Sequence, residues 1–434
     1  MLKKMSVIVS FALSVSALSA CSSTGTPEKP KPSADEKIQT GEPATVQLAI
    51  SKGWLTDEEI DKYIIDPTKK KFPNITIKLV TMDGKNVTPT TLVAAGTVPD
   101  LIIVANPTIN DITSLELDDN IEPLIKKHNI DLNKFKPETL AAIKGSTGYD
   151  YLVGLPYAMH FSALYYNKDL FNKFGVPFPK DGMTWDEVTE LARKMTRLDN
   201  GVQYRGLEPD HVTRPASQLS LGLIDPKTMK TTVNSEQWKK VFTTLKNIYD
   251  IPGNNQMQNF NNASDQFAKD KTLAMRPELN VLGRFAAVKD LNWDLVTYPT
   301  FKETPNTGMQ VDEHILAITR TSKVKDAAMD VISVVVSDEV QLTMAGDAKV
   351  STLKDDKFIK EFGKNVDYVK GKNMEAVLRM KQATPVAVTK YDKIPKDRIQ
   401  NAMESVVKGQ EDINTALRTA EEEINNKLAT ETKK

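Results

Sequence analysis

Apolar and polar residues follow two alternating periods from about residue 44 onward. "TVQLAI" at 45–50 and "NITIKLV" at 74–80 alternate in character and are rich in β-branched residues, which predicts strands. Between them, "TDEEIDKYIIDPTKKK" predicts a helix that begins after Thr56, because threonine caps helices well and acids fill the first turn. A turn at Gly96 precedes a short apolar run, 101–104, that predicts a buried strand. This order predicts an α/β domain with a largely parallel sheet.

The middle and the end of the chain carry further local signals. "SALYYN" predicts a strand, and "KDLFNKFG" predicts a short helix that ends at Gly175. Thr184-Trp185-Asp186-Glu187 is a T-x-x-E capping box, so the next helix is expected to begin at Thr184. Apolar residues at helical spacing predict amphipathic helices over 324–335 and 413–428.

The first twenty residues differ from the rest of the chain. Two lysines precede the apolar, serine-rich run "MSVIVSFALSVSALSA", which is short for a membrane-spanning helix of about 20 residues. A basic start, an apolar middle and small residues at the end predict a secretory signal peptide over residues 1–20. Cys21 is the single cysteine, so a disulfide within the chain is excluded.

The residues around Cys21 indicate a membrane anchor. Leu18-Ser19-Ala20-Cys21 resembles the bacterial lipobox, which implies that the thiol of Cys21 receives a lipid and that cleavage makes it the mature N-terminus. The alternative is an ordinary signal peptide with an incidental cysteine. The stretch that follows is rich in proline and poor in large aliphatic residues, so residues 21–43 are interpreted as a lipid anchor and a disordered tether.

The length, the net charge and the motifs of the chain argue against several classes of function. A chain of 434 residues predicts two domains of about 150–200 residues each. The formal net charge is zero, which argues against a nucleic-acid-binding surface. The 4 histidines show no ligand-like spacing, and motifs such as H-E-x-x-H, C-x-x-C, G-x-S-x-G and the phosphate-binding loop are absent from the sequence. The sequence therefore predicts no metal, no cofactor and no catalysis, although an acid pair of the glycosidase type stays open.

Five sequence blocks, in order, carry a family resemblance: "TKKKFPNITIKLV", "AAGTVPDLIIVANP", "GLPYAMHFSALYYNKDLFNKFGVPFPKDGMTWDEVTELARKM", "FAKDKTLAMRPELN" and "HILAITRTSKVKDAAMDVISVVVS". They resemble the extracellular solute-binding proteins of bacterial ABC importers, in particular the large maltose-binding-like family. One block departs from the family pattern, because Pro277-Glu278-Leu279-Asn280 replaces a frequent Gly-x-Trp. That departure removes an aromatic residue often used for stacking on the ligand.

The resemblance implies a two-lobed, periplasmic-binding-protein-like α/β fold of type II, with a hinge and an interlobe cleft. One lobe is expected to comprise 44–158 plus 314–348, and the other 159–312 plus 350–434. The protein would bind a small-molecule ligand by hinge closure and deliver it to a membrane permease. It would act as a monomer, held by its lipid on the extracellular face of the cell membrane of a Gram-positive type of bacterium.

Sugars have apolar ring faces and polar rims, so their sites need aromatic platforms beside amide, carboxylate or histidine groups. Loops at the carboxyl ends of strands, and the segments that cross between lobes, are where such groups are expected. The candidate ligand-binding residues are Trp54, Asn106, Tyr157, His160, Glu278, Asn280 and Asp312. For each of them, packing, a turn or a hinge contact is the alternative role. The other tryptophans, Trp185, Trp238 and Trp293, are interpreted as packing residues.

These residues predict a binding protein for a carbohydrate, with an oligosaccharide favoured. Two alternatives stay open: a binding protein for a non-sugar solute such as a peptide or a polyamine, and a secreted carbohydrate-active enzyme.

Overall fold

The computed structural model describes residues 41–286 and 288–433. The predicted signal peptide, Cys21 and almost all of the predicted tether lie outside the described residues. Among the helices that are described, none combines the length and the apolar character needed to cross a membrane.

The first of two five-stranded sheets contains the strands predicted near the start of the chain. Its order is β2 (Ile75–Met82), β1 (Ala44–Ser51), β3 (Leu101–Ala105), β13 (Glu313–Ile318) and β4 (Gly154–Met159). Strand β1 runs parallel to both β2 and β3, whereas β13 runs antiparallel to β3 and β4. The predicted parallel arrangement of the first three strands is therefore confirmed, and one strand from late in the chain is inserted beside them.

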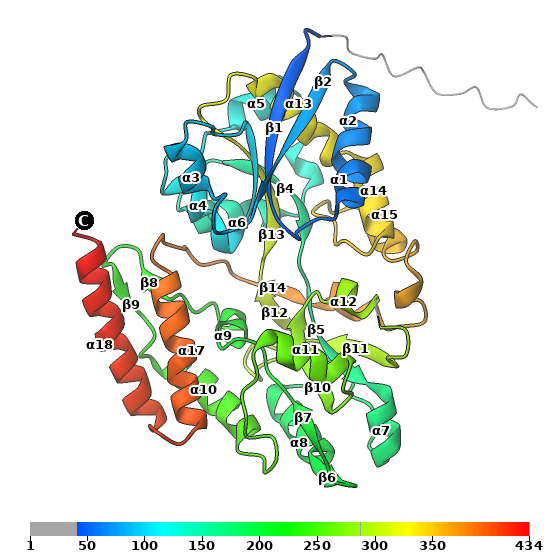
Figure 1. The fold of residues 1–434 in the computed structure, drawn as a ribbon, viewed down its shortest axis with the longest axis vertical. Helices are drawn as coiled ribbons and strands as arrows, with labels where there is room; N and C mark the ends of the chain where they lie inside the picture. Colours follow the sequence, from blue (N-terminus) through cyan, green and yellow to red (C-terminus); the bar gives the residue numbers. More distant parts are fainter. Residues whose placement is uncertain (1–40, 287, 434) are drawn as a thin grey trace, which may run out of the picture. The chain divides into compact units, whose positions relative to one another are not determined.

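Helices surround this sheet (Figure 1). They are α1 (Asp57–Ile60), which continues through a π-helical turn (Asp61–Ile65) into α2 (Asp66–Lys71), then α3 (Pro89–Ala94), α4 (Asn110–Thr113), α5 (Glu122–Lys127), α6 (Pro137–Thr147), α13 (Lys325–Val335), α14 (Asp338–Gly346) and α15 (Asp356–Glu361). Thr56 caps α1 as predicted: the Glu59 amide donates to Thr56 Oγ1 at 3.1 Å, and the Thr56 amide donates to Glu59 Oε2 at 2.9 Å.

The second five-stranded sheet has the order β11 (Trp293–Thr297), β5 (Ser162–Asn167), β10 (Leu273–Leu279), β7 (Val202–Leu207) and β6 (Arg197–Asp199). Only β10 and β7 pair in parallel within it. Two smaller sheets accompany it: β12 (Thr307–Gln310) with β14 (Lys381–Ala383), and β8 (Ile224–Asp225) with β9 (Lys230–Thr231).

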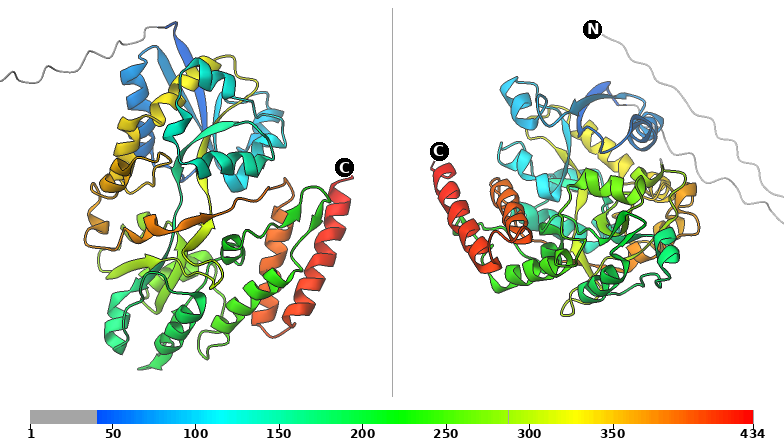
Figure 2. Two further views of the ribbon diagram at one scale, coloured as in Figure 1. Left: turned by 180° about the vertical axis from the view of Figure 1, so that it is seen from behind. Right: turned by 60° about the horizontal axis from the view of Figure 1, so that its bottom comes forward.

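The helices on this side are α7 (Lys168–Phe174), α8 (Trp185–Met195), α9 (Thr213–Gln218), α10 (Glu236–Tyr249), α11 (Phe260–Ala268), α12 (Leu282–Ala286), α16 (Ala376–Arg379), α17 (Lys393–Val407) and α18 (Ile413–Glu431). The predicted capping box at Thr184 is present, and Gly175 ends α7 with a left-handed φ of 64°. Figure 2 shows α17 and α18 side by side in both views, at the end of the chain.

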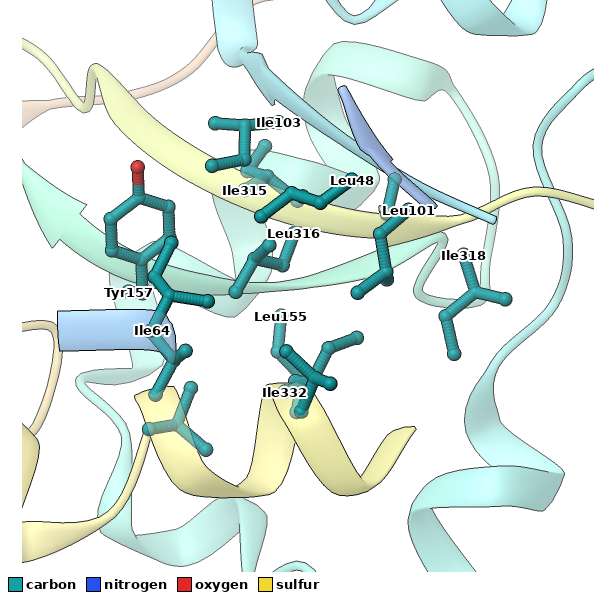
Figure 3. Close-up of a cluster of buried hydrophobic side chains, with 14 of the residues drawn as sticks. Leu48, Ile64, Leu101, Ile103, Leu155, Tyr157, Ile315, Leu316, Ile318 and Ile332 are labelled. Atoms are coloured by element: carbon teal, nitrogen blue, oxygen red, sulfur yellow. The ribbon is translucent and has the colours of Figure 1, made fainter. Parts of the chain in front are cut away.

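Each large sheet has its own hydrophobic core. The core of the first sheet is mostly aliphatic and joins residues from early in the chain, such as Leu48 and Leu101, to Leu316 and Ile332 from far later. Figure 3 shows these side chains between the strands and α13, with the ring of Tyr157 at the margin and its hydroxyl directed away from Ile64. Burial of such apolar surface is the main stabilising contribution to folding.

Two short segments connect the sheets. Residues 160–161 lead from β4 to β5, and residues 311–312 lead from β12 to β13. The two segments contact each other, because the His160 amide donates a hydrogen bond to the Asp312 carbonyl at 2.7 Å. The expected boundaries between lobes stay a prediction.

Candidate ligand-binding site

Parallel strands bring two of the predicted residues to the same edge of the first sheet. Trp54 follows the end of β1, and Asn106 follows the end of β3. Because β1 and β3 are parallel neighbours, both side chains lie at the carboxyl edge, where open α/β sheets place their ligand sites. The start of β13 meets this edge, since His314 pairs with Ala105.

His314 brings together three predicted residues. The half-buried indole of Trp54 stacks on its imidazole, with 4.5 Å between ring centroids and 4° between planes. The Tyr157 hydroxyl lies 3.4 Å from His314 Nδ1, and His160 Nε2 lies 3.1 Å from His314 Nε2. Burial, reinforced by the neighbouring His160, holds the pKa of His314 well below its usual value, so this group is uncharged at neutral pH.

Asn106 is buried and bonded to the residue before His314. Its Oδ1 accepts a hydrogen bond from the Glu313 amide at 2.9 Å, and its Nδ2 donates to Glu313 Oε1 and to Ser146 Oγ, both at 3.4 Å. Glu313 is fully buried, and this burial raises its pKa well above the usual value for a carboxyl. The surroundings of this carboxyl therefore favour its protonated form over the carboxylate.

Asp312 lies in the segment 311–312, which leads from β12 to β13, and it contacts a helix on the side of the second five-stranded sheet. Its carboxylate lies 3.7 Å from the guanidinium of Arg214 on α9. Arg214 also pairs with Asp210 at 3.3 Å, so one cation is shared between two carboxylates.

Glu278, in β10, belongs to the same charged row. Its side chain accepts from Arg276 at 2.7 Å and shares a hydrogen bond with Asp210. Burial and the nearby Asp210 raise the pKa of Glu278 to about 8. Asn280 has a local role, because its Oδ1 accepts from the Leu282 amide at 3.2 Å at the start of α12.

Two cavities lie beside these groups. The larger, about 480 Å³, is lined by Asn106 and Asp312 and by segments near α4, α9 and α17. The smaller, about 280 Å³, is lined by Asp210 and Glu278. The other predicted residues, Trp54, Tyr157, His160 and Asn280, line neither cavity. Burial lowers the pKa of His211, in the wall of the smaller cavity, to about 4.

The lining of the larger cavity differs from the expected aromatic platform. Within the described part of the chain, Trp238 is its one aromatic residue. Charged side chains are frequent in it: Asp111, Arg214, Asp312, Lys390, Asp392, Lys393, Lys396 and Asp397. Residues 41–286 and 288–433 contain no group of three or more His, Cys, Asp or Glu side chains arranged to hold a metal ion.

Residues 63–356 match the sequence model of a family described as bacterial extracellular solute-binding protein. The chain belongs to this family. No curated protein matches the chain. The predicted family and the two-lobed α/β fold class are therefore confirmed, the latter by solved structures that this solute-binding protein resembles.

Among these structures is the ABC substrate-binding protein Lmo0181 from Listeria monocytogenes in complex with cycloalternan, at 20% identity and a TM-score of 0.70, covering 89% of this chain and 100% of that one. Another is the sugar-binding protein MalE from Xanthomonas citri, at 17% identity and a TM-score of 0.69, covering 90% and 98%. A third is UgpB from Mycobacterium tuberculosis in complex with glycerophosphocholine, at 14% identity and a TM-score of 0.71, covering 90% and 100%. Identities this low show the fold alone.

Four residues at the site of this solute-binding protein were not among the sequence candidates: Arg214, Trp238, Glu313 and His314. His314 and Glu313 had a usable signal, since they directly follow the candidate Asp312 in the sequence. Arg214 and Trp238 had none, because they reach the cavity only through the packing of α9 and α10.

Proposed function

We propose that the protein is the substrate-binding component of a bacterial ABC importer, and that it captures a carbohydrate, with an oligosaccharide favoured, for delivery to a membrane permease. The larger cavity is the observation that best supports this proposal, because elements beside both five-stranded sheets line it. Asn106 and Ser146 lie on the side of the first sheet, and Arg214 and Ser217 lie on the side of the second. Hinge closure around a bound ligand uses such a two-sided site. The protein has no catalytic role in this proposal.

The relatives support a carbohydrate ligand. One structural neighbour carries cycloalternan and another is named a sugar-binding protein. The seven candidates from the sequence remain the proposed ligand contacts. Trp54 is half-buried and its ring stacks on His314, so the indole is held in a fixed orientation at the carboxyl edge of the sheet. A sugar ring that packs against the indole would gain the apolar contact that aromatic residues supply.

A second candidate is a charged, non-sugar solute such as a polyamine or a peptide. The observation that favours it is the density of charged side chains in the larger cavity, among them Asp111, Lys390 and Lys396. A structural neighbour in complex with glycerophosphocholine points in the same direction.

A binding screen separates these candidates. Thermal shift and calorimetry are run with glucose, maltotriose, mannotriose, spermidine, a tripeptide and glycerophosphocholine, since a ligand present at 100 times its Kd stabilises the folded protein by about 2.7 kcal/mol. Stabilisation by a sugar alone supports the proposal, and stabilisation by a charged probe alone replaces it with the second candidate. Turnover of a glycan by the purified protein would instead identify a secreted carbohydrate-active enzyme.

The role of Trp54 has its own test. Trp54→Ala is expected to weaken sugar binding at least tenfold, about 1.4 kcal/mol. Phe178→Ala is the control, because Phe178 is a partly exposed aromatic residue (37% exposed) that packs against Tyr166 and Phe171, away from Trp54 and His314. An unchanged Kd in Trp54→Ala would remove Trp54 from the site.

We infer from the sequence that lipid on Cys21 holds the mature protein at the extracellular face of the cell membrane. One acyl chain gives only reversible membrane binding, whereas two anchor stably. Cys21→Ser is expected to move the protein from the membrane fraction into the medium. Membrane retention of this variant would contradict the anchor.

A further inference from the structure

Most of the charged side chains that line the larger cavity already have a partner. The Arg214 guanidinium faces Asp312 at 3.7 Å, and Lys393 pairs with Asp397 at 2.7 Å. The Lys390 ammonium lies 5.1 Å from the centre of the tyrosine ring that follows it in the sequence. The class of ligand therefore depends most on the charged groups of the cavity that remain unpaired.

Lys396, near the start of α17, is one of these groups. It is exposed and lines the cavity, so a ligand can reach its ammonium. Within residues 41–286 and 288–433, this ammonium forms no hydrogen bond and no ion pair. Lys396 therefore brings an unpaired positive charge to the cavity wall.

Arg214 lies near Lys396 and adds further donors. The cavity walls partly remove the Lys396 ammonium from water, and the nearby Arg214 repels it, so both effects lower the pKa of Lys396. The contacts of Arg214 with Asp210 and Asp312, at 3.3 and 3.7 Å, are longer than charge-assisted hydrogen bonds of about 2.7–2.9 Å. The guanidinium thus keeps N–H donors for a ligand, and an anion that contacts both cations would relieve their repulsion.

We propose that Lys396 and Arg214, together called the cationic pair, bind the carboxylate of a uronic acid, so that the captured carbohydrate is an acidic oligosaccharide. This inference rests on the proposed carbohydrate function and names the class of sugar. It also explains how a cavity for a sugar can have a strongly charged lining.

Asp111, on α4, would bind another part of the same ligand. It is exposed, lines the larger cavity, and has no hydrogen bond or ion pair in the described part of the chain. Its carboxylate can accept hydrogen bonds from two neighbouring sugar hydroxyls. Helix α4 lies with the helices of the first sheet, whereas α9 and α17 lie beside the second (Figure 1). An acidic sugar that contacts Asp111 and the cationic pair would therefore be held from both sides, as hinge closure requires.

A carboxylate fits the cationic pair better than a phosphate ester does. Asp210 and Asp312 lie near the same two cations, so they repel additional negative charge on the ligand. A phosphate ester carries a charge of about −1.5 to −2 near neutral pH, whereas a carboxylate carries a single negative charge. The smaller charge gains the attraction of the cationic pair with less repulsion from the two aspartates.

The test compares acidic and neutral sugars of the same length by calorimetry. The probes are trigalacturonate and trimannuronate, the methyl esters of both, maltotriose, mannotriose and glucose-6-phosphate. At least one uronate is expected to bind the wild type about tenfold or more tightly than its methyl ester does, because esterification removes the charge that the cationic pair recognises.

Lys396→Met tests the cationic pair directly, because methionine keeps an aliphatic side chain and removes the charge. This variant is expected to raise the Kd of the uronate about tenfold or more, and to leave Tm and the Kd of any neutral sugar unchanged. Lys396→Arg is expected to keep most of the affinity. Lys427→Met is the matched control: Lys427 is an exposed lysine of α18 that has no ion pair within the described residues and lines neither cavity, so its replacement should leave the uronate Kd unchanged.

The outcomes separate this inference from the carbohydrate function on which it rests. If maltotriose, mannotriose or a methyl ester binds as tightly as the uronates, the carbohydrate function stands and the acidic class is wrong. Tighter binding of glucose-6-phosphate than of either uronate would replace the carboxylate with a phosphate. An unchanged uronate Kd in Lys396→Met would remove Lys396 from the site. If no sugar of any kind binds, the carbohydrate function fails, and the acidic class fails with it.

Discussion

Replacing Glu278 with glutamine should change how the stability of the protein depends on pH. Glu278 is 3% exposed, lies in β10, and shares a hydrogen bond with Asp210. Burial and the Asp210 carboxylate raise its pKa from 4.5 to about 8. Between these values the folded protein keeps a proton that the unfolded chain has lost. The stability linked to this proton is fully present below pH 4.5 and is lost as the pH rises through 8.

Because of this proton, the free energy of unfolding is expected to fall by about 1.4 kcal/mol for each pH unit between 4.5 and 8. His211 acts in the opposite sense at lower pH, because its pKa falls from 6.5 to about 4 and the unfolded chain then binds the extra proton. The contribution of Glu278 is therefore clearest between pH 6.5 and 8, where it amounts to about 2 kcal/mol. In Glu278→Gln this part of the slope should disappear, since glutamine does not titrate.

Urea unfolding at pH 6.5, 7.0, 7.5 and 8.0 measures the effect. The free energy of unfolding is compared by its pH slope rather than its absolute value, because glutamine also loses the ion pair with Arg276. Glu236→Gln is the control. The Glu236 side chain is 86% exposed, so its replacement is expected to leave the pH slope of the wild type unchanged. Identical slopes for the wild type and Glu278→Gln would show that Glu278 does not hold a proton in the folded protein over this pH range, and would refute its raised pKa.

Three further substitutions test packing, a buried hydrogen-bond network and capping. Gly206→Ala should lower the free energy of unfolding by about 2–4 kcal/mol, measured by chemical unfolding, because the new Cβ would lie 2.2 Å from the Ala192 carbonyl oxygen. Gly283→Ala is the control: its Cβ would have no atom within 4 Å, so the free energy of unfolding should stay the same or rise. Gln341→Leu should lower the free energy of unfolding by about 3 kcal/mol, because it leaves two buried carbonyls and the Ser351 hydroxyl without their partner, and a loss below about 1 kcal/mol would contradict this. Thr184→Ala should cost about 1 kcal/mol through its capping box, and Thr184→Ser should restore most of it.

Local elements of this fold could be predicted from the sequence because their causes are local. The alternation at 45–50 and the cap at Thr56 act over a few residues, and both predictions are confirmed as β1 and α1. The capping box at Thr184 is confirmed for the same reason. The position of β13 between β3 and β4 is different, because its pairing joins residues that are far apart in the sequence, such as His314 with Ala105 and Glu313 with Met159. The pattern of one segment does not specify such a partner.

The site was less predictable because residue type alone does not determine what a side chain meets. Trp54 was expected as a sugar platform, and in the structure one face of its ring stacks on His314. Glu278 was expected in the cleft, and it lies in a buried charged row with Arg276 and Asp210. Trp238 was interpreted as packing, which is correct for its ring, but its indole also lines the larger cavity.

Three consecutive residues, at the end of the segment 311–312 and the start of β13, contact three different groups. Asp312 faces Arg214 of α9, Glu313 bonds Asn106 beside β3, and His314 stacks on Trp54 beside β1. The contacts of Glu313 and His314 lie within the first part of the fold, so they persist if the two parts move as rigid bodies. The contact between Asp312 and Arg214 joins the two parts and changes with any such movement. A ligand that contacts both Asn106 and Arg214 would therefore favour the arrangement in which the distance between Asp312 and Arg214 is short.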